Sequence, residues 1–93
     1  MPYIVVAYDI SDDRRRRIAA EKLCALGFHR VQKSVYIARG SSTLAKEVYR
    51  ALLRIIDSSR DFTMVITVPR ESIEKALVHG MSIDIGGEGS LVI

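Results

Sequence analysis

Asp9 is the residue of this chain best placed to do chemistry, because it is a carboxylate at the end of an apolar run from Tyr3 to Tyr8. A charge that ends a buried segment is costly unless something compensates it. Two interpretations are open: Asp9 caps the following turn or pairs with an arginine, or it binds a hard cation such as Mg²⁺ or Mn²⁺. One carboxylate makes a poor magnesium site. A two-fold axis near the end of the segment would bring two copies of Asp9 together, and they would repel each other unless a cation or a proton lay between them.

Four consecutive arginines, Arg14 to Arg17, follow at the start of an expected helix. Cations at this end of a helix face an unfavourable dipole and repel one another. The ordinary interpretation is a solvated helix face that Asp12 and Asp13 partly neutralise. The functional interpretation is phosphate binding, for which the planar guanidinium is better suited than an ammonium group. On that interpretation, the residues that bind nucleic acid are Arg15, Arg16 and Arg17.

A second candidate surface lies in residues 29–39, which alternate in the manner of a strand. One parity is polar or amphipathic and the other is apolar. The first set is Arg30, Gln32, Ser34 and Tyr36, and the second is Val31, Val35 and Ile37. The polar set is either an ordinary solvent face or part of a binding groove, in which Arg30 and Tyr36 would contact nucleic acid. The two histidines, His29 and His79, have no third partner nearby in the sequence, so a zinc site is not expected.

The remaining segments supply the elements that must position these residues. The run that ends at Asp9 predicts a strand buried on both faces. Ser11, Asp12 and Asp13 offer N-caps for a helix that should end near Leu26, before Gly27. We expect the apolar stripe of this helix to consist of Ile18, Ala19, Leu23 and Leu26. Residues 29–39 then form either one bent strand or a hairpin around Lys33 and Ser34.

The second half of the chain predicts a helix, a strand and a further short helix. Gly40 to Thr43 precedes a second helix, whose stripe is Leu44, Val48, Leu52, Ile55 and Ile56. Phe62 to Val68 is a β-branched, apolar strand that Pro69 ends. Residues 70–79 predict a short helix with Ile73, Ala76 and Leu77 facing inward. After Gly80 the chain is rich in glycine, with short apolar pieces typical of edge strands or an arm.

This order predicts an α+β fold, a ferredoxin-like βαββαβ sandwich in residues 1–80, followed by a tail in residues 81–93 that forms an extra edge strand or an exchanged strand. Two helices cover only one face of such a sheet. Because both parities of the first strand are apolar, the other face also needs cover. A second copy of the chain is the simplest cover, so we expect a homodimer through that face.

Composition narrows the class of protein. The 93 residues suffice for one domain, with a net charge of +3. The basic excess lies in residues 1–40, which hold eight Lys and Arg against four Asp and Glu. A local excess of this kind favours a polyanion-facing surface. Cys24 stands alone, which excludes an intramolecular disulfide, and we expect it to be a small buried residue in a reducing, cytoplasmic protein. The sequence shows neither a signal segment nor a membrane span.

Two motifs together resemble a known family. Residues 8–13, Tyr-Asp-Ile-Ser-Asp-Asp, precede the arginine run, and Arg-Val-Gln-Lys-Ser-Val-Tyr follows at residues 30–36. In order and separation they resemble the paired signatures of the CRISPR-associated protein 2 family, over about residues 3–69. The resemblance implies a ferredoxin-like homodimer that joins the CRISPR integrase when new spacers are inserted. It also implies a possible metal-dependent endonuclease activity on RNA or double-stranded DNA.

Carried over by position, the resemblance makes Asp9 the magnesium ligand at the dimer axis, with Tyr8 beside it as a second catalytic residue. It assigns substrate contact or activity to Arg15, Arg17, Arg30 and Tyr36. Residues 37–39 lack the acidic residue of many relatives, and the tail after Gly80 has no clear family pattern. Three hypotheses follow: a metal-assisted phosphodiesterase, a non-catalytic DNA-binding adaptor for the integrase, and a ferredoxin-like dimer unrelated to nucleic acid.

Overall fold

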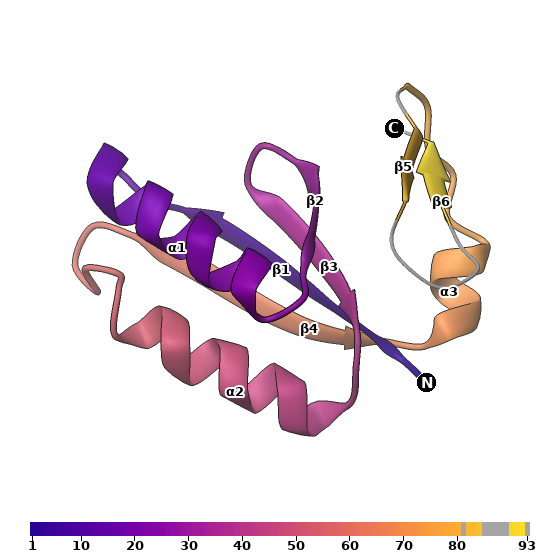
Figure 1. The fold of residues 1–93 in the computed structure, drawn as a ribbon, viewed down its shortest axis with the longest axis horizontal. Helices are drawn as coiled ribbons and strands as arrows, with labels where there is room; N and C mark the ends of the chain where they lie inside the picture. Colours follow the sequence, from indigo (N-terminus) through magenta and orange to yellow (C-terminus); the bar gives the residue numbers. More distant parts are fainter. Residues whose placement is uncertain (81, 85–89, 93) are drawn as a thin grey trace.

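A computed structural model describes residues 1–80, 82–84 and 90–92 of the chain (Figure 1). Strands and helices follow one another in the predicted order. The elements are β1 (Tyr3–Asp9), α1 (Asp13–Ala25), β2 (His29–Gln32), β3 (Val35–Arg39), α2 (Ser42–Leu53), β4 (Phe62–Val68), α3 (Arg70–Glu74), β5 (Ser82–Asp84) and β6 (Ser90–Val92). The segment at 29–39 is therefore a hairpin with Lys33 and Ser34 in its turn, which decides between the two interpretations left open above.

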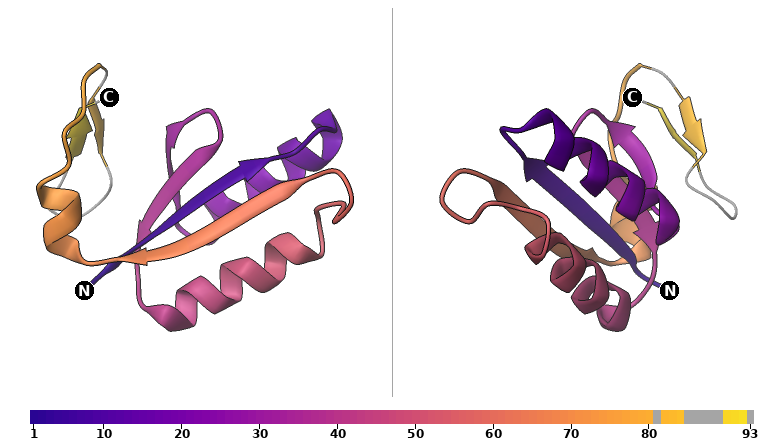
Figure 2. Two further views of the ribbon diagram at one scale, coloured as in Figure 1. Left: turned by 180° about the vertical axis from the view of Figure 1, so that it is seen from behind. Right: turned by 60° about the vertical axis from the view of Figure 1, so that its left-hand side comes forward.

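The first four strands form one antiparallel sheet in the order β2-β3-β1-β4, with β1 hydrogen-bonded on both sides. Helices α1 and α2 lie side by side on the same face of this sheet, as the views in Figures 1 and 2 show. Two crossover helices on one face of an antiparallel sheet are the arrangement of the ferredoxin-like sandwich. The predicted α+β fold is confirmed.

The core lies between the sheet and these two helices. Alternate residues of β1 point into it, namely Ile4, Val6 and Tyr8, and they pack with Leu23 of α1 and Val48 of α2. Side chains alternate between the faces of a strand, so the other residues of β1 point to the opposite face. The helix α2 stripe is confirmed, although Ile55 and Ile56 contact the core from beyond the helix end at Leu53.

Two expectations about α1 are wrong. Ile18 is 39% exposed rather than part of the buried stripe, and Cys24 is exposed rather than buried. Each is a sequence neighbour of a fully buried residue, Ala19 and Leu23 respectively. Because successive residues are about 100° apart around a helix, a neighbour of a central stripe residue falls on its flank. The buried stripe of α1 is therefore narrower than predicted, and Ile18 and Cys24 lie outside it among mostly polar residues.

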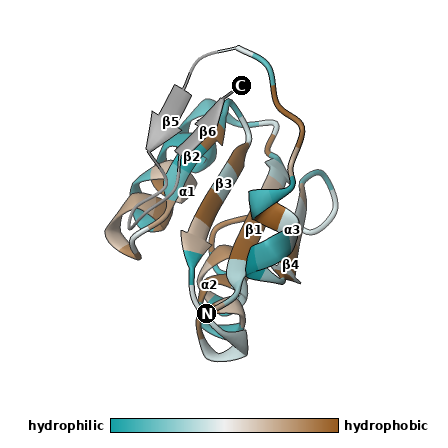
Figure 3. Ribbon diagram, turned by 90° about the vertical axis from the view of Figure 1, so that its right-hand side faces the viewer, coloured by the Kyte–Doolittle hydropathy of each residue, from teal (hydrophilic) through white to brown (hydrophobic). Residues whose placement is uncertain are grey.

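The face of the sheet opposite the helices carries apolar side chains with little cover, and Figure 3 shows brown, hydrophobic stretches on β1 and β3. Three residues of β4 on this face, Phe62, Met64 and Ile66, are 55%, 43% and 41% exposed. Among the described residues, Tyr3, Ile37 and Ile73 pack together and fill one end of the face. We call this surface the open face. It matches the surface that the sequence predicts to need a second copy.

The C-terminal segment differs from expectation. Helix α3 ends at Glu74, so Ala76 is exposed and Leu77 is 99% exposed instead of facing inward. Strands β5 and β6 pair with each other in a separate two-stranded sheet and not with the edge of the main sheet. Residues 81, 85–89 and 93 of the predicted tail lie outside the described residues, and strand exchange stays a prediction. Within the described ranges, no helix has both the length and the apolar character needed to cross a bilayer.

Candidate functional site

Asp9 is the last residue of β1, where its backbone lies opposite Phe62 of β4. It shares the parity of Val5 and Ala7 and therefore lies at the end of the open face. Its side chain is exposed, and among residues 1–80 it has no hydrogen bond or ion pair. Asp12 caps α1 instead, accepting a 2.9 Å hydrogen bond from the backbone N–H of Arg15. In one chain, the interpretation of Asp9 as a turn cap or ion-pair partner is therefore wrong.

A cleft of about 430 Å³ opens beside Asp9, between the first half of α1 and the hairpin of β2 and β3. Its walls combine four basic side chains with two acidic ones. The lining residues are Tyr8, Asp9, Ile10, Asp13, Arg16, Arg17, Ala20, Arg30, Lys33, Ser34 and Tyr36. A concave surface with an excess of positive charge concentrates anions. We call it the basic cleft; it brings the two signature motifs of the sequence to one place.

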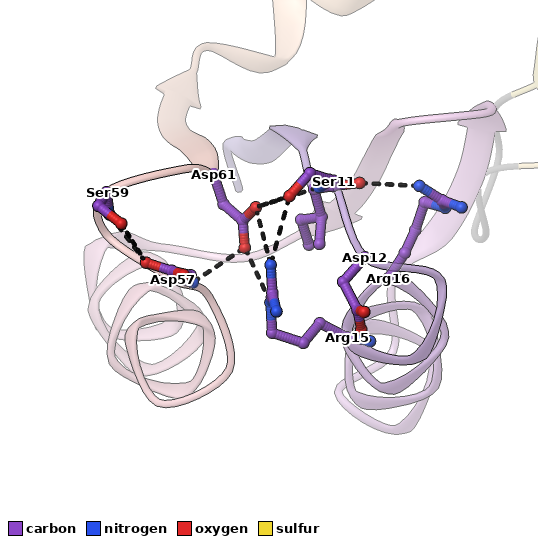
Figure 4. Close-up of polar contacts among 8 residues, drawn as sticks. Ser11, Asp12, Arg15, Arg16, Asp57, Ser59 and Asp61 are labelled. Carbon is purple, nitrogen blue, oxygen red and sulfur yellow. Dashed lines mark hydrogen bonds and ion pairs between the residues drawn. The ribbon is translucent and has the colours of Figure 1, made fainter.

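The basic side chains of the cleft differ in their freedom. Arg16 donates a 2.8 Å hydrogen bond to the carbonyl oxygen of Ile10, which holds its guanidinium over the turn after β1 (Figure 4). It also forms an ion pair with Asp13. Arg17 and Arg30 are exposed, and neither side chain has a hydrogen bond or ion pair within the described part of the chain. Their donors are available to a ligand.

Lys33 was missed as a binding residue by sequence reasoning. It stands in the hairpin turn, where it is exposed and lines the basic cleft. The signal that could have found it is its place inside the second motif, between Gln32 and Ser34. Only the hairpin, which the sequence left undecided, turns this position toward α1.

Arg15, which the sequence assigns to nucleic-acid binding, has an internal partner instead. Its Nε and Nη2 atoms donate to the two carboxylate oxygens of Asp61 at 3.0 and 3.2 Å, as Figure 4 shows. The Asp61 side chain is fully covered. The fork of hydrogen bonds from Arg15 is the main reason that the pKa of Asp61 lies well below its usual range. Arg15 is therefore occupied within the chain, and it does not line the basic cleft.

Tyr8 and Tyr36 form the floor of the cleft. Their rings are stacked with centroids 5.8 Å apart, their hydroxyl groups are 3.5 Å apart, and they are only 5% and 2% exposed. Burial is the main cause that raises the pKa of the Tyr8 phenol above its ordinary value, and the hydrogen bond to Tyr36 adds to it. Tyr8 is thus protonated at neutral pH and unsuited to act as a base. Tyr36 is too buried for its ring to stack on a nucleic-acid base.

The predicted polar face of the hairpin is divided. Arg30 pairs with Tyr36, but the register shifts between Arg30 and Gln32, and Gln32 pairs with Val35. A bulge of this kind moves the following side chains to the other face of the sheet. Arg30 and Tyr36 therefore lie on the helix side with the basic cleft, whereas Gln32 lies with Val35 on the open face.

The metal-binding capacity of one chain is small. Within the described residues, no three His, Cys, Asp or Glu side chains gather closely enough to hold an ion. Asp9 supplies the oxygen ligands that Mg²⁺ and Mn²⁺ prefer, and its exposure leaves them accessible. Asp9 fits a hard cation as one ligand of a shared site, but not as a complete site.

Comparisons with known proteins agree with this geometry. The profile of the family described as "CRISPR associated protein Cas2" matches residues 1–76. A protein of Aeropyrum pernix named "CRISPR-associated endoribonuclease Cas2" is 52% identical over 86 residues, which cover 92% of this chain and 94% of the relative. A Thermoproteus tenax protein named "CRISPR-associated endonuclease Cas1/endonuclease Cas2 fusion" is 31% identical over 81% of this chain and 28% of that longer protein. The crystal structure of Streptococcus pyogenes Cas2 superposes with a TM-score of 0.70 at 24% identity, covering 84% of this chain and 99% of that one, which supports the fold.

Proposed function

The chain belongs to the family of CRISPR-associated Cas2 proteins, and from this premise we propose that it is a dimeric, divalent-cation-dependent endonuclease that takes part in CRISPR adaptation. The observation that carries the proposal is the position of Asp9. An exposed carboxylate without an internal partner ends the central strand, with an apolar open face on one side and a basic cleft on the other. The first surface suits a second copy of the chain, and the second suits a phosphate backbone.

The open face supports a homodimer with its two-fold axis near Asp9. Phe62, the cross-strand neighbour of Asp9, is 55% exposed, and Met64 and Ile66 continue the apolar surface along β4. Burying these side chains against their copies removes apolar area from water, at roughly 25 cal/mol for each Å². The same contact brings the two Asp9 carboxylates close together. Each subunit then supplies one ligand to a shared Mg²⁺ or Mn²⁺ ion.

A cation held there would activate a water molecule and neutralise charge on the phosphodiester. The side chains of the cleft would bind the phosphate backbone. Arg17, Arg30 and Lys33 have donors free to bind phosphate oxygens, and Arg16 is held in place by Ile10. Tyr8 is protonated and lies in the floor of the cleft, where its role is structural and it does not transfer a proton. The name of the Aeropyrum relative supports RNA as the substrate.

A second candidate function is that of a non-catalytic adaptor, which holds duplex DNA and the integrase. Two observations favour it. The cleft offers few groups for acid–base catalysis, since its tyrosines are buried, it contains no histidine, and Asp13 is ion-paired with Arg16, which leaves Asp9 and Lys33. The Thermoproteus relative joins Cas1 and Cas2 in one chain, which supports a Cas1-type integrase as partner.

A cleavage assay with purified wild type and Asp9→Asn separates the two functions. Asn keeps the shape of the side chain but is a poorer ligand for a hard cation. We expect cleavage of a structured RNA with Mn²⁺ or Mg²⁺ to fall by on the order of 100-fold or more. Duplex DNA serves as the second substrate. Glu21→Gln is the matched control, because Glu21 is exposed on α1 and does not line the cleft.

Undiminished cleavage by Asp9→Asn would overturn the assignment of Asp9. A wild type that binds duplex DNA but cleaves neither substrate at any cation concentration would support the adaptor.

A further inference from the structure

Asp61, at the end of the loop between α2 and β4, makes more polar contacts than any motif residue, although the sequence did not single it out. Its carboxylate accepts five hydrogen bonds from three segments of the chain (Figure 4). Oδ1 accepts from the backbone N–H and the hydroxyl of Ser11, each at 3.0 Å. Oδ2 accepts from the backbone N–H of Asp57 at 2.9 Å, and the Arg15 fork spans both oxygens.

These contacts hold the short turn that connects Asp9 to α1. Each of its three residues has a separate anchor. Arg16 binds the carbonyl of Ile10, Asp61 binds Ser11, and Asp12 caps the helix. Arg15 adds a 3.4 Å hydrogen bond to the hydroxyl of Ser11. Asp61 also precedes Phe62, the β4 residue opposite Asp9. It therefore contacts the end of β1 in two ways, through the β4 backbone beside Asp9 and through its hydrogen bonds to Ser11.

We propose that Asp61 is a positioning residue, which acts through Ser11 and Arg15 to fix the turn at residues 10–12 and thereby the place of Asp9 and Arg16 at the mouth of the basic cleft. The purpose of this positioning rests on the proposed function of Asp9. In the same arrangement Arg15 serves the fold of the site and not the phosphate backbone, although it stands in the arginine run.

Charge and geometry both support this role. A carboxylate without solvent exposure requires compensation, and the bidentate guanidinium of Arg15 supplies it. Neither oxygen is replaceable. Asn at position 61 would present an NH₂ group on one side, so either Ser11 or Asp57 would lose the acceptor of its amide, and that NH₂ would also face the Arg15 donors.

Arg15→Ala and Arg17→Ala, each made in the whole 93-residue chain, test the proposal with two measurements. Amide hydrogen exchange reports the anchoring of the turn, and the salt dependence of binding to a duplex DNA reports phosphate contacts. Arg15→Ala should speed exchange at Ser11 by on the order of tenfold, because the carboxylate loses the cation that fixes it, and it should leave the salt dependence unchanged. Arg17→Ala should leave exchange at Ser11 unchanged and should flatten the salt dependence of duplex binding. The amide of Gly40, bonded to Pro2 at the far end of the sheet, is the internal control for exchange.

Asp61→Asn is the third variant, and it tests Asp61 directly. We expect faster exchange at Ser11 or Asp57, and a kcat for RNA cleavage lower by on the order of tenfold with KM little changed, because Asp9 is displaced while the phosphate-binding side chains remain. Val48→Ala is the stability control, since it removes core volume beneath α2 without touching the turn. Arg60→Ala is the charge control, because Arg60 is an exposed neighbour of Asp61.

Distinct results overturn distinct claims. If the amides of Ser11 and Asp57 exchange in Asp61→Asn as slowly as in wild type, the positioning role is overturned. It is also overturned if Asp61→Asn loses no more kcat than Val48→Ala when the two variants have the same free energy of unfolding. A flatter salt dependence for Arg15→Ala would make Arg15 a phosphate ligand after all. If wild type neither cleaves RNA nor binds duplex DNA, the proposed function fails, and the exchange measurements still decide whether Asp61 anchors the turn.

Discussion

Replacing Arg17 and Arg30 together by alanine should flatten the salt dependence of duplex binding. Both guanidinium groups are exposed in the basic cleft and lack partners among the described residues, so their loss removes phosphate contacts without breaking an internal bond. Each phosphate neutralised contributes roughly 0.9 to the slope of log K against log salt. If both subunits of a dimer engage and each arginine neutralises one phosphate, the slope should fall by up to about 3.6.

This magnitude is readily measured. Between about 50 and 200 mM salt, the affinity of wild type should fall roughly 100-fold more than that of the variant. Fluorescence anisotropy of one labelled duplex, titrated at several salt concentrations, gives both slopes. Arg60→Ala is the control for net charge, because Arg60 is exposed outside the cleft. Equal slopes for wild type and the double variant would refute the assignment of the cleft as a phosphate-binding surface, and a flatter slope for Arg60→Ala would show only a general charge effect.

Three further results are expected. In sedimentation velocity, wild type should sediment as the proposed dimer and Met64→Lys as a monomer, because the lysine places a charge in the middle of the open face; a dimer that persists in Met64→Lys would exclude that face as the interface. The free energy of unfolding of wild type, measured in urea, should fall above about pH 10, because tyrosine ionises in the unfolded chain there while buried Tyr8 keeps its proton. The free energy of unfolding of Tyr8→Phe should fall less, and parallel pH profiles of the two proteins would contradict this. Cys24 should react with a thiol reagent in the native protein at the rate of an exposed cysteine, and protection until unfolding would show that it is buried.

The fold could be predicted because its signals are local. The apolar run before Asp9, the stripe of α2 and the alternation after Phe62 each follow from the period of one element. Asp9 stood out for a related reason, since a carboxylate at the end of an apolar strand departs from the pattern around it. The narrow stripe of α1 could not be predicted, because the helix packs through Ala19 and Leu23 and leaves their neighbours exposed.

The parts of the site that sequence reasoning missed depend on contacts across the chain. Arg15 looked like its neighbours in the arginine run, and its partner Asp61 lies 46 residues away. Tyr36 looked available because it shares the polar parity of residues 29–39, but it lies on the helix side of the sheet opposite Val6 and is only 2% exposed. The same parity placed Gln32 beside Tyr36, whereas the bulge between Arg30 and Gln32 moves Gln32 to the open face. No periodicity in the sequence marks a bulge that contains neither glycine nor proline. Only the paired strands show which side chains remain free for a ligand.

The stoichiometry of Mn²⁺ binding shows whether two copies of Asp9 share one cation. Within the described residues, no three His, Cys, Asp or Glu side chains of one chain gather closely enough to hold an ion, and the proposed site takes one ligand from each of two chains. Electron paramagnetic resonance of Mn²⁺ titrated into the purified protein should show one tightly bound ion for every two chains, and none for Asp9→Asn. One ion for every chain, or the same binding by Asp9→Asn, would contradict the account.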